Sequence, residues 1–106
     1  MAYKPEGYTS VAPYLTVNGA QNTIDFLIRV FGAQTLRMIP GGEGKIAHGE
    51  VRIDDTVIML TDAVEGWPTT ASHVHVYVED VDAVFERAVA AGATITDGEV
   101  EANFCF

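Results

Sequence analysis

Apolar and polar residues alternate in several short runs of this chain, and two of these runs are followed by a helical pattern. Residues 11–17 alternate with a period of two, which is typical of a β-strand. The next apolar side chains recur three and four positions apart, at Ile24, Leu27, Ile28 and Phe31. This spacing predicts a helix with one apolar face, and we expect it to begin at Asn18 or Gly19.

Three more strands are expected in the first half of the chain. Residues 35–39 form the first of them, and a turn rich in glycine follows at residues 40–44. Residues 45–53 and 56–61 then alternate on either side of two adjacent aspartates. Aspartate tolerates turn conformations, so these two runs predict a β-hairpin.

The second half of the chain repeats the combination of strand and helix. Residues 72–79 alternate like a strand, and Asp80 has the side chain expected of a helix N-cap. The predicted buried stripe of the helix consists of Val81, Val84, Phe85, Ala88 and Val89. A short strand at residues 94–96 and a tail at residues 97–106 would complete the chain.

These observations amount to an internal repeat. Tyr14–Leu36 and Val74–Ile95 each read as strand, helix and strand, and each helix ends in Gly-Ala. The repeat predicts an α+β fold of paired βαβββ modules, of which the second is incomplete. The 106 residues suit one domain, which we divide into module one at about 10–62, a linker at 63–71 and a partial module two at 72–106.

The alternation also predicts two faces for the sheet. If the helices cover one face, the apolar side chains that point at them include Ala47, Gly49, Val51, Ile53, Ile58 and Leu60. The opposite, helix-free face would then gather Tyr14, Thr16, His48, Glu50, Met59, His73, His75 and Tyr77. Such a mixture of polar and aromatic side chains suits a cleft for a small molecule, with Trp67 as a further wall. An outer face that is simply solvated is the plainer interpretation.

Composition narrows the choice of partner and compartment. The formal net charge is -9, with six scattered lysines and arginines, so we expect no binding of nucleic acid or anionic membranes. Cys105 is the only cysteine, so no disulfide forms within the chain. No segment is typical of a signal peptide or a membrane span, which favours a soluble, cytoplasmic protein.

Several short stretches, taken in their order and spacing, suggest a family. They are Pro13-Tyr14-Leu15, Phe31-Gly32-Ala33, the stretch from His48 to Ile53, Val57-Ile58-Met59-Leu60, the stretch from Tyr77 to Ala83, and Ala91-Gly92-Ala93-Thr94. With these stretches, the chain resembles the vicinal oxygen chelate superfamily of glyoxalase I, bleomycin resistance proteins and extradiol dioxygenases. Within that superfamily it is most similar to the PhnB-like branch.

The resemblance implies where a divalent metal would be bound in metal-dependent members. The ligand position of the first strand falls on Ala12, that of the fourth on Met59 and that of the fifth on His73. Alanine has no ligand atom, and a thioether is a poor ligand for the metals concerned. We therefore predict no bound metal and no other cofactor, and a divalent ion with His73 as a ligand is the less favoured alternative.

The resemblance also implies two more strands after residue 96 than the sequence supplies. Three explanations are open: a chain that is truncated at its C-terminus, a partner chain that fills the gap, or a changed topology. An open sheet edge favours association, so we expect a truncated chain whose absent strands are replaced in a homodimer.

Three functions remain open on the sequence alone. The first is a metal-free protein that binds a small-molecule ligand in the predicted cleft. The second is a metal-dependent lyase or dioxygenase of the glyoxalase I type, in which Glu50 would be the candidate catalytic, proton-transferring residue. The third is a truncated family member without activity that is stable only as an oligomer.

Overall fold

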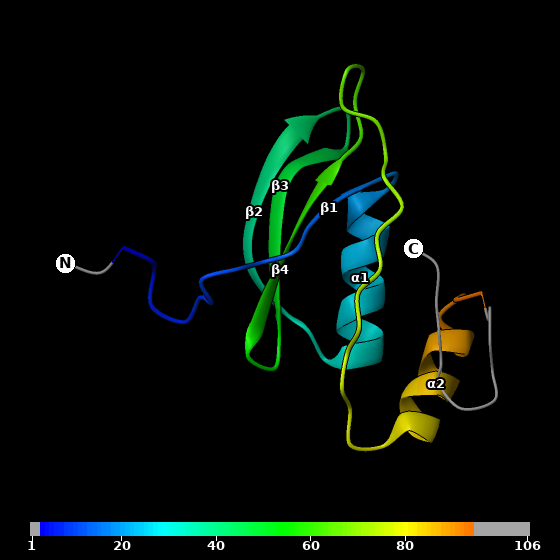
Figure 1. Cartoon of the computed structure of the whole chain (residues 1–106). Coiled ribbons are helices and arrows are strands. Elements are labelled where there is room, and N and C mark those ends of the chain that lie inside the picture. Colours follow the sequence, from blue (N-terminus) through cyan, green and yellow to red (C-terminus); the bar gives the residue numbers. More distant parts are fainter. Residues whose placement is uncertain (1–2, 95–106) are drawn as a thin grey trace.

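The computed structural model describes residues 3–94, in which one four-stranded sheet is covered on one face by a helix (Figure 1). A second helix packs against the first. The elements in chain order are β1 (Tyr14–Val17), α1 (Ala20–Phe31), β2 (Gln34–Gly42), β3 (Lys45–Ile53), β4 (Thr56–Asp62) and α2 (Val81–Ala90). The predicted α+β class is confirmed, and of the second repeat unit only α2 is a regular element within residues 3–94.

The sheet has the strand order β1-β4-β3-β2. The pair β1 and β4 is parallel, whereas β4 with β3 and β3 with β2 are antiparallel. Two short turns make these antiparallel connections possible: Glu43 and Gly44 both have positive φ, and so does Asp54. Positive φ in a two-residue turn matches the twist of the flanking strands, so the aspartate hairpin predicted from the sequence is confirmed.

The core lies between α1 and the sheet. Ile24 and Leu27 are buried there as predicted, against strand residues such as Val51 and Leu60. Ile28 was wrongly assigned to the buried stripe, because 40% of its surface is exposed. Val30 is fully buried in its place. It lies where α2 packs against α1, and the Arg87 side chain of α2 donates two hydrogen bonds to the Val30 carbonyl oxygen at 2.9 and 3.1 Å.

A β-bulge changes the inward-facing residues at the start of β3. Ile39 pairs with His48 and Pro40 with Ile46, so Ala47 is an extra residue without a partner on β2. Ile46 is therefore buried and Ala47 exposed, the reverse of the predicted phase. Beyond the bulge the alternation is as predicted.

Gly49 allows the sheet and α1 to approach each other closely. A Cβ atom at this position would lie 3.0 Å from Ile24 Cδ1 and 3.4 Å from Met38 Sδ. A carbon atom so close to Cδ1 overlaps with it, so glycine is the residue that fits here.

The start of α1 is held by a carboxylate at the end of β4. Gly19, the N-cap, has a left-handed backbone, and no side chain of its own helix end caps it. Asp62 Oδ1 instead accepts hydrogen bonds from the backbone N–H groups of Gly19 and Ala20, both at 2.9 Å. Asp62 Oδ2 accepts one from the Ile46 N–H at 2.7 Å. One buried side chain thus joins β4, α1 and β3.

The environment of Asp62 favours its charged form. Burial raises the pKa of this carboxyl group, but the hydrogen bonds from Ile46, Ala20 and Gly19 lower it further, so the net pKa lies below the ordinary value of 3.8. Asp62 therefore stabilises the fold at pH values above about 4, and its contribution is lost as the pH falls through the lowered pKa.

The strand predicted for residues 72–79 is wrong. The segment is extended but belongs to no strand, and it runs beside α1 (Figure 1). Val74 and Val76 pack against the core of the first unit, while Tyr77 is 92% exposed. The predicted alternation is therefore present, although the valines pack against the core on the helix side of the sheet.

Helix α2 begins as the sequence predicts. Asp80 is the N-cap, and its side chain accepts a hydrogen bond from the Ala83 N–H at 3.0 Å. Of the predicted stripe, Ala88 is buried, but Val81 and Val89 are exposed within the chain. The strand predicted from residue 94 onward and the tail lie outside the described residues. Neither helix of residues 3–94 is long and apolar enough to cross a membrane.

Replacing Asp62 with asparagine should lower the free energy of unfolding by about 2–3 kcal/mol at neutral pH, because backbone N–H groups lose a charged acceptor. The difference from wild type should begin to shrink below about pH 4 and should be lost as the pH falls through the lowered pKa of Asp62 in the folded protein. Urea denaturation at several pH values measures both effects. Asp54→Asn is the matched control, since Asp54 lies exposed in the hairpin turn. An equal loss in both variants would contradict the role of Asp62.

Gly49→Ala should destabilise the protein by about 1–3 kcal/mol through overlap with Ile24 Cδ1. Ile24→Val removes that methyl group and by itself should cost about 0.5–1.5 kcal/mol. The double variant should lose less stability than the sum of the losses in the two single variants. A double-mutant cycle based on thermal or urea unfolding measures this difference. Strictly additive losses would show that the helix and sheet do not meet at Gly49.

Candidate ligand-binding site

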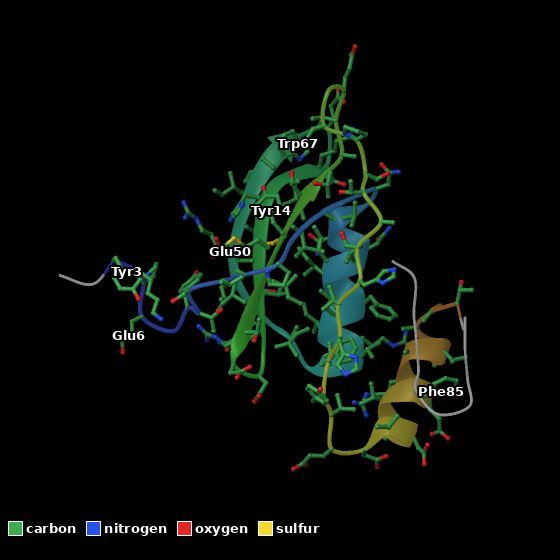
Figure 2. All side chains as sticks on the ribbon, viewed as in Figure 1. Tyr3, Glu6, Tyr14, Glu50, Trp67 and Phe85 are labelled. Atoms are coloured by element: carbon green, nitrogen blue, oxygen red, sulfur yellow. The ribbon has the colours of Figure 1, made fainter. Side chains whose placement is uncertain are left out.

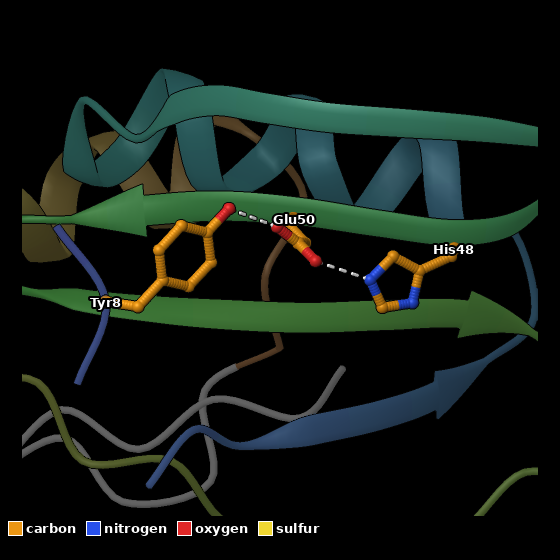
Figure 3. Close-up of polar contacts among 3 residues, drawn as sticks. All are labelled: Tyr8, His48 and Glu50. Carbon is orange, nitrogen blue, oxygen red and sulfur yellow. Dashed lines mark hydrogen bonds and ion pairs between the residues drawn. The ribbon is translucent and has the colours of Figure 1, made fainter. Parts of the chain in front are cut away.

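A short chain of hydrogen bonds lies on the helix-free face of the sheet (Figure 3). The Tyr8 hydroxyl donates to Glu50 Oε1 at 2.5 Å, and Glu50 Oε2 lies 2.6 Å from His48 Nε2. Both oxygens of Glu50 are therefore engaged by side chains.

Different parts of the chain position these three residues. His48 and Glu50 are two positions apart on β3, so the pleat directs both to the same face. Tyr8 belongs to the N-terminal segment, which lies on the side of the sheet away from α1 (Figure 1). Arg52, further along β3, holds this segment by donating to the Gly7 carbonyl oxygen at 3.0 Å. No periodic pattern points to Tyr8, because it lies in a stretch rich in polar residues, glycine and proline.

The environment of Glu50 keeps its carboxylate charged although it is only 5% exposed. Burial raises the pKa of Glu50, but the hydrogen bonds from Tyr8 and His48 lower it, and the net pKa lies below 4.5. The hydrogen bond to Glu50 in turn raises the pKa of the Tyr8 hydroxyl above 10.0. At neutral pH the network thus contains a carboxylate anion and a protonated phenol.

A hollow of about 280 Å³ lies beside this network, towards the end of β4. It is lined by Tyr14, Gly41, Lys45, Ile46, Ala47, Thr61, Asp62, Val64 and Trp67. Tyr14 and Trp67 are 48% and 58% exposed, so both present aromatic surface to solvent. The Trp67 indole is fixed by a hydrogen bond from Nε1 to Thr16 Oγ1 at 3.1 Å.

Tyr14 connects the hollow with the hydrogen-bonded network. Its ring centre lies 5.8 Å from that of His48, with the rings inclined at 41°. Figure 2 shows Trp67, Tyr14 and Glu50 following one another along the sheet. An aromatic surface, an anionic carboxylate and an imidazole therefore lie in sequence on one face.

Five of the predicted cleft residues lie together on the helix-free face. Tyr14 and Met59 are register partners on β1 and β4, and Met59 is also opposite Glu50 on β3. Thr16 and His48 complete this group through their contacts with Trp67 and Glu50.

The other three predicted residues lie elsewhere. His73, His75 and Tyr77 are exposed on the extended segment beside α1, and the rings of His75 and Tyr77 contact each other in a T-shaped arrangement. Their placement on the helix-free face depended on a fifth sheet strand, which residues 72–79 do not form. The sequence did not point to Tyr8, Lys45 or Asp62.

The residues at the implied metal positions do not fit a metal site. Ala12 has no ligand atom, Met59 lies opposite Glu50, and His73 is on the exposed segment. Within residues 3–94, no three side chains of His, Cys, Asp or Glu come together as metal ligands would. His48 and Glu50 are close together, but Glu50 is already bonded through both oxygens.

Comparison with known proteins gives consistent results. The family model described as Glyoxalase/Bleomycin resistance protein/Dioxygenase superfamily matches residues 8–102. The uncharacterized protein Mb0911c of Mycobacterium bovis is 37% identical in a match that covers 81% of this chain and 64% of that protein. This chain thus spans somewhat less than two thirds of that relative's length.

Two solved structures are similar to this chain. TioX from Micromonospora sp. ML1 is 26% identical, with a TM-score of 0.58 and coverage of 89% of this chain and 81% of TioX. The fosfomycin resistance protein FosX from Listeria monocytogenes is 18% identical, with a TM-score of 0.66 and coverage of 100% and 83%. FosX is also known in complex with Mn(II) and 1S,2S-dihydroxypropylphosphonic acid.

The sheet order, the helix on one face and the extent of the family match agree with one another. This chain belongs to the Glyoxalase/Bleomycin resistance protein/Dioxygenase superfamily.

Proposed function

We propose that this protein binds a small molecule, without a metal ion, on the helix-free face between Glu50 and Trp67. The observation that carries the proposal is the buried, anionic Glu50, held by Tyr8 and His48 beside an aromatic hollow. A buried carboxylate costs free energy that an apolar residue at the same position would avoid. Its presence at the centre of a sheet face therefore favours a role in binding.

The form of the hollow supports the same proposal. Its exposed apolar surface comes from Tyr14, Val64 and Trp67. Its charged groups are Lys45 at the start of β3 and Asp62, whose oxygens already accept hydrogen bonds from backbone N–H groups. Binding sites for small molecules combine mostly apolar walls with a few placed polar groups. FosX, whose fold is similar, is bound to a small phosphonic acid in one of its structures.

Among the described residues, the side chains at the implied ligand positions do not come together as metal ligands would. This favours a metal-free mode of binding over a metal-dependent lyase or dioxygenase. Of the implied positions, only His73 could bind a divalent ion, and it lies on the segment beside α1. The observation that favours the metal-dependent alternative is the Mn(II) bound in a structure of FosX. The chelator experiment below distinguishes the two.

We also propose that the protein is a homodimer of the PhnB-like branch. The backbone of residues 73–79 takes part in no sheet pairing, and an extended segment of this kind is prone to pair with another chain. The solution mass tests this assembly independently of ligand binding.

Binding of one- and two-ring aromatic compounds should quench or shift the fluorescence of Trp67, the only tryptophan of the chain. Tyr14→Ala should weaken binding roughly two- to tenfold through loss of an aromatic contact. Tyr77→Ala is the matched control, because Tyr77 lies on the exposed segment away from the site. The affinities of the wild-type protein and of the Tyr77→Ala variant should be unchanged after treatment with a strong chelator.

Three outcomes would contradict this proposal. Loss of binding on chelation, together with one divalent ion per chain that is lost in His73→Ala, would favour the metal-dependent enzyme. A folded protein that binds none of the compounds would favour an inactive member of the family. Equal weakening by both tyrosine variants would place the site elsewhere.

A further inference from the structure

We infer that Nδ1 of His48 is the proton acceptor of this site and that its ligands carry an acidic hydroxyl group on an aromatic ring. The inference rests on the proposed function and extends it from binding to proton transfer. It assigns to His48 the role for which Glu50 was the candidate in the sequence.

Burial, together with its hydrogen bonds, makes Glu50 a poor group to take a proton from a ligand. Oε1 accepts from Tyr8 and Oε2 faces His48 Nε2, and the side chain is only 6% exposed, so a ligand has little access to the remaining lone pairs. Because Glu50 is ionised, it is an acceptor only, and His48 Nε2 must carry the hydrogen of this bond. In the neutral ring, Nδ1 then has the free lone pair.

The position of His48 leaves Nδ1 accessible. In Figure 3 the imidazole directs Nε2 at Glu50, and its other nitrogen lies on the opposite part of the ring. None of the hydrogen bonds among residues 3–94 involves Nδ1, and 24% of the side chain is exposed. The neighbouring Tyr14 ring lines the hollow, and its centre lies 5.8 Å from that of His48. We therefore place the ring of the ligand in the hollow, with its hydroxyl group directed past Tyr14 towards His48.

The proposed step is a single proton transfer. The O–H bond of the ligand breaks, its electron pair remains on oxygen, and an N–H bond forms at His48 Nδ1. The product is an oxyanion beside an imidazolium ring, and the negative charge of Glu50 stabilises that positive ring. Tyr8 keeps its proton and fixes Glu50, so Tyr8 and Glu50 are positioning residues.

The walls of the hollow indicate the rest of the ligand. Tyr14 and Trp67 offer exposed aromatic surface, against which a flat ring can stack. Lys45 and Asp62 line the same hollow. The Asp62 oxygens are engaged by backbone N–H groups, so Lys45 is the charged group there that can attract an anionic ligand. Together these groups select an aromatic ring that bears an ionisable hydroxyl group.

The probe for the test is para-nitrophenol, whose anion absorbs visible light while the neutral form does not. At about pH 7, where an ordinary imidazole is mostly neutral and much of the free probe is still neutral, wild-type protein should increase the absorbance of the anion. Equilibrium dialysis measures the bound amount separately. Circular dichroism establishes that each variant is folded.

His48→Gln should remove the absorbance increase, since glutamine cannot take the proton, and His75→Gln on the exposed segment should leave it unchanged. Glu50→Gln should reduce the ratio of bound anion to bound neutral probe on the order of tenfold, the effect of a removed charge on a neighbouring titrating group. Tyr8→Phe should reduce that ratio less, because the charge of Glu50 remains.

The outcomes separate this inference from the proposed function. Retention of the probe without an increase in absorbance, or an increase that survives His48→Gln, would overturn proton transfer to His48 while the binding site stands. If neither this probe nor the other aromatic compounds are retained by folded wild-type protein, the proposed function fails as well. An equal effect of His75→Gln would show that any exposed imidazole accounts for the signal.

Discussion

The Asp62 carboxylate holds together the elements on which the rest of the structure depends. Asp62 lies at the end of β4. Its carboxylate accepts hydrogen bonds from the backbone N–H groups at the start of α1 and from the N–H group of Ile46 on β3. Helix α1 follows a glycine N-cap, so without Asp62 its first N–H groups would lack a side-chain acceptor. A negative charge at this point also interacts favourably with the positive end of the helix dipole. One side chain therefore connects the start of α1 with both β3 and β4.

Two buried carboxylates of this small protein serve different purposes because their partners differ. Asp62 is surrounded by backbone donors, which are present whatever the neighbouring side chains are. Glu50 is held by the side chains of Tyr8 and His48, one from the N-terminal segment and one from its own strand. Side-chain partners of this kind can change rotamer without a change in the backbone. For this reason we assign a role in the fold to Asp62 and propose a role in the binding site for Glu50.

Much of the first unit could be predicted from the sequence, because each pattern of apolar and polar residues there is compatible with one local structure. The hairpin of β3 and β4 and the joint placement of His48 and Glu50 follow from a period of two. Ala47 departs from that period because of a bulge, and a bulge depends on register with β2, which local sequence does not reveal. Similarly, the hydrogen bond between Tyr8 and Glu50 joins residues that are 42 positions apart in the chain. The hydrogen bonds from the start of α1 to Asp62 span 42 and 43 positions. Contacts of this range are outside any pattern of neighbouring residues.

The segment at residues 72–79 shows the limit of the alternation argument. Alternation with a period of two predicts which side chains lie on the same side of an extended chain, and Val74 and Val76 do lie on the same side. Alternation does not predict what covers these side chains. The core on the helix side of the sheet can bury them as well as a neighbouring strand can. With the valines placed there, His73, His75 and Tyr77 necessarily face away from the core. The residues of the site, Tyr8, Tyr14, His48, Glu50 and Trp67, therefore all precede this segment. Among residues 3–94, the side chains that make up this site thus come from the N-terminal segment, β1, β3 and the residues that follow β4.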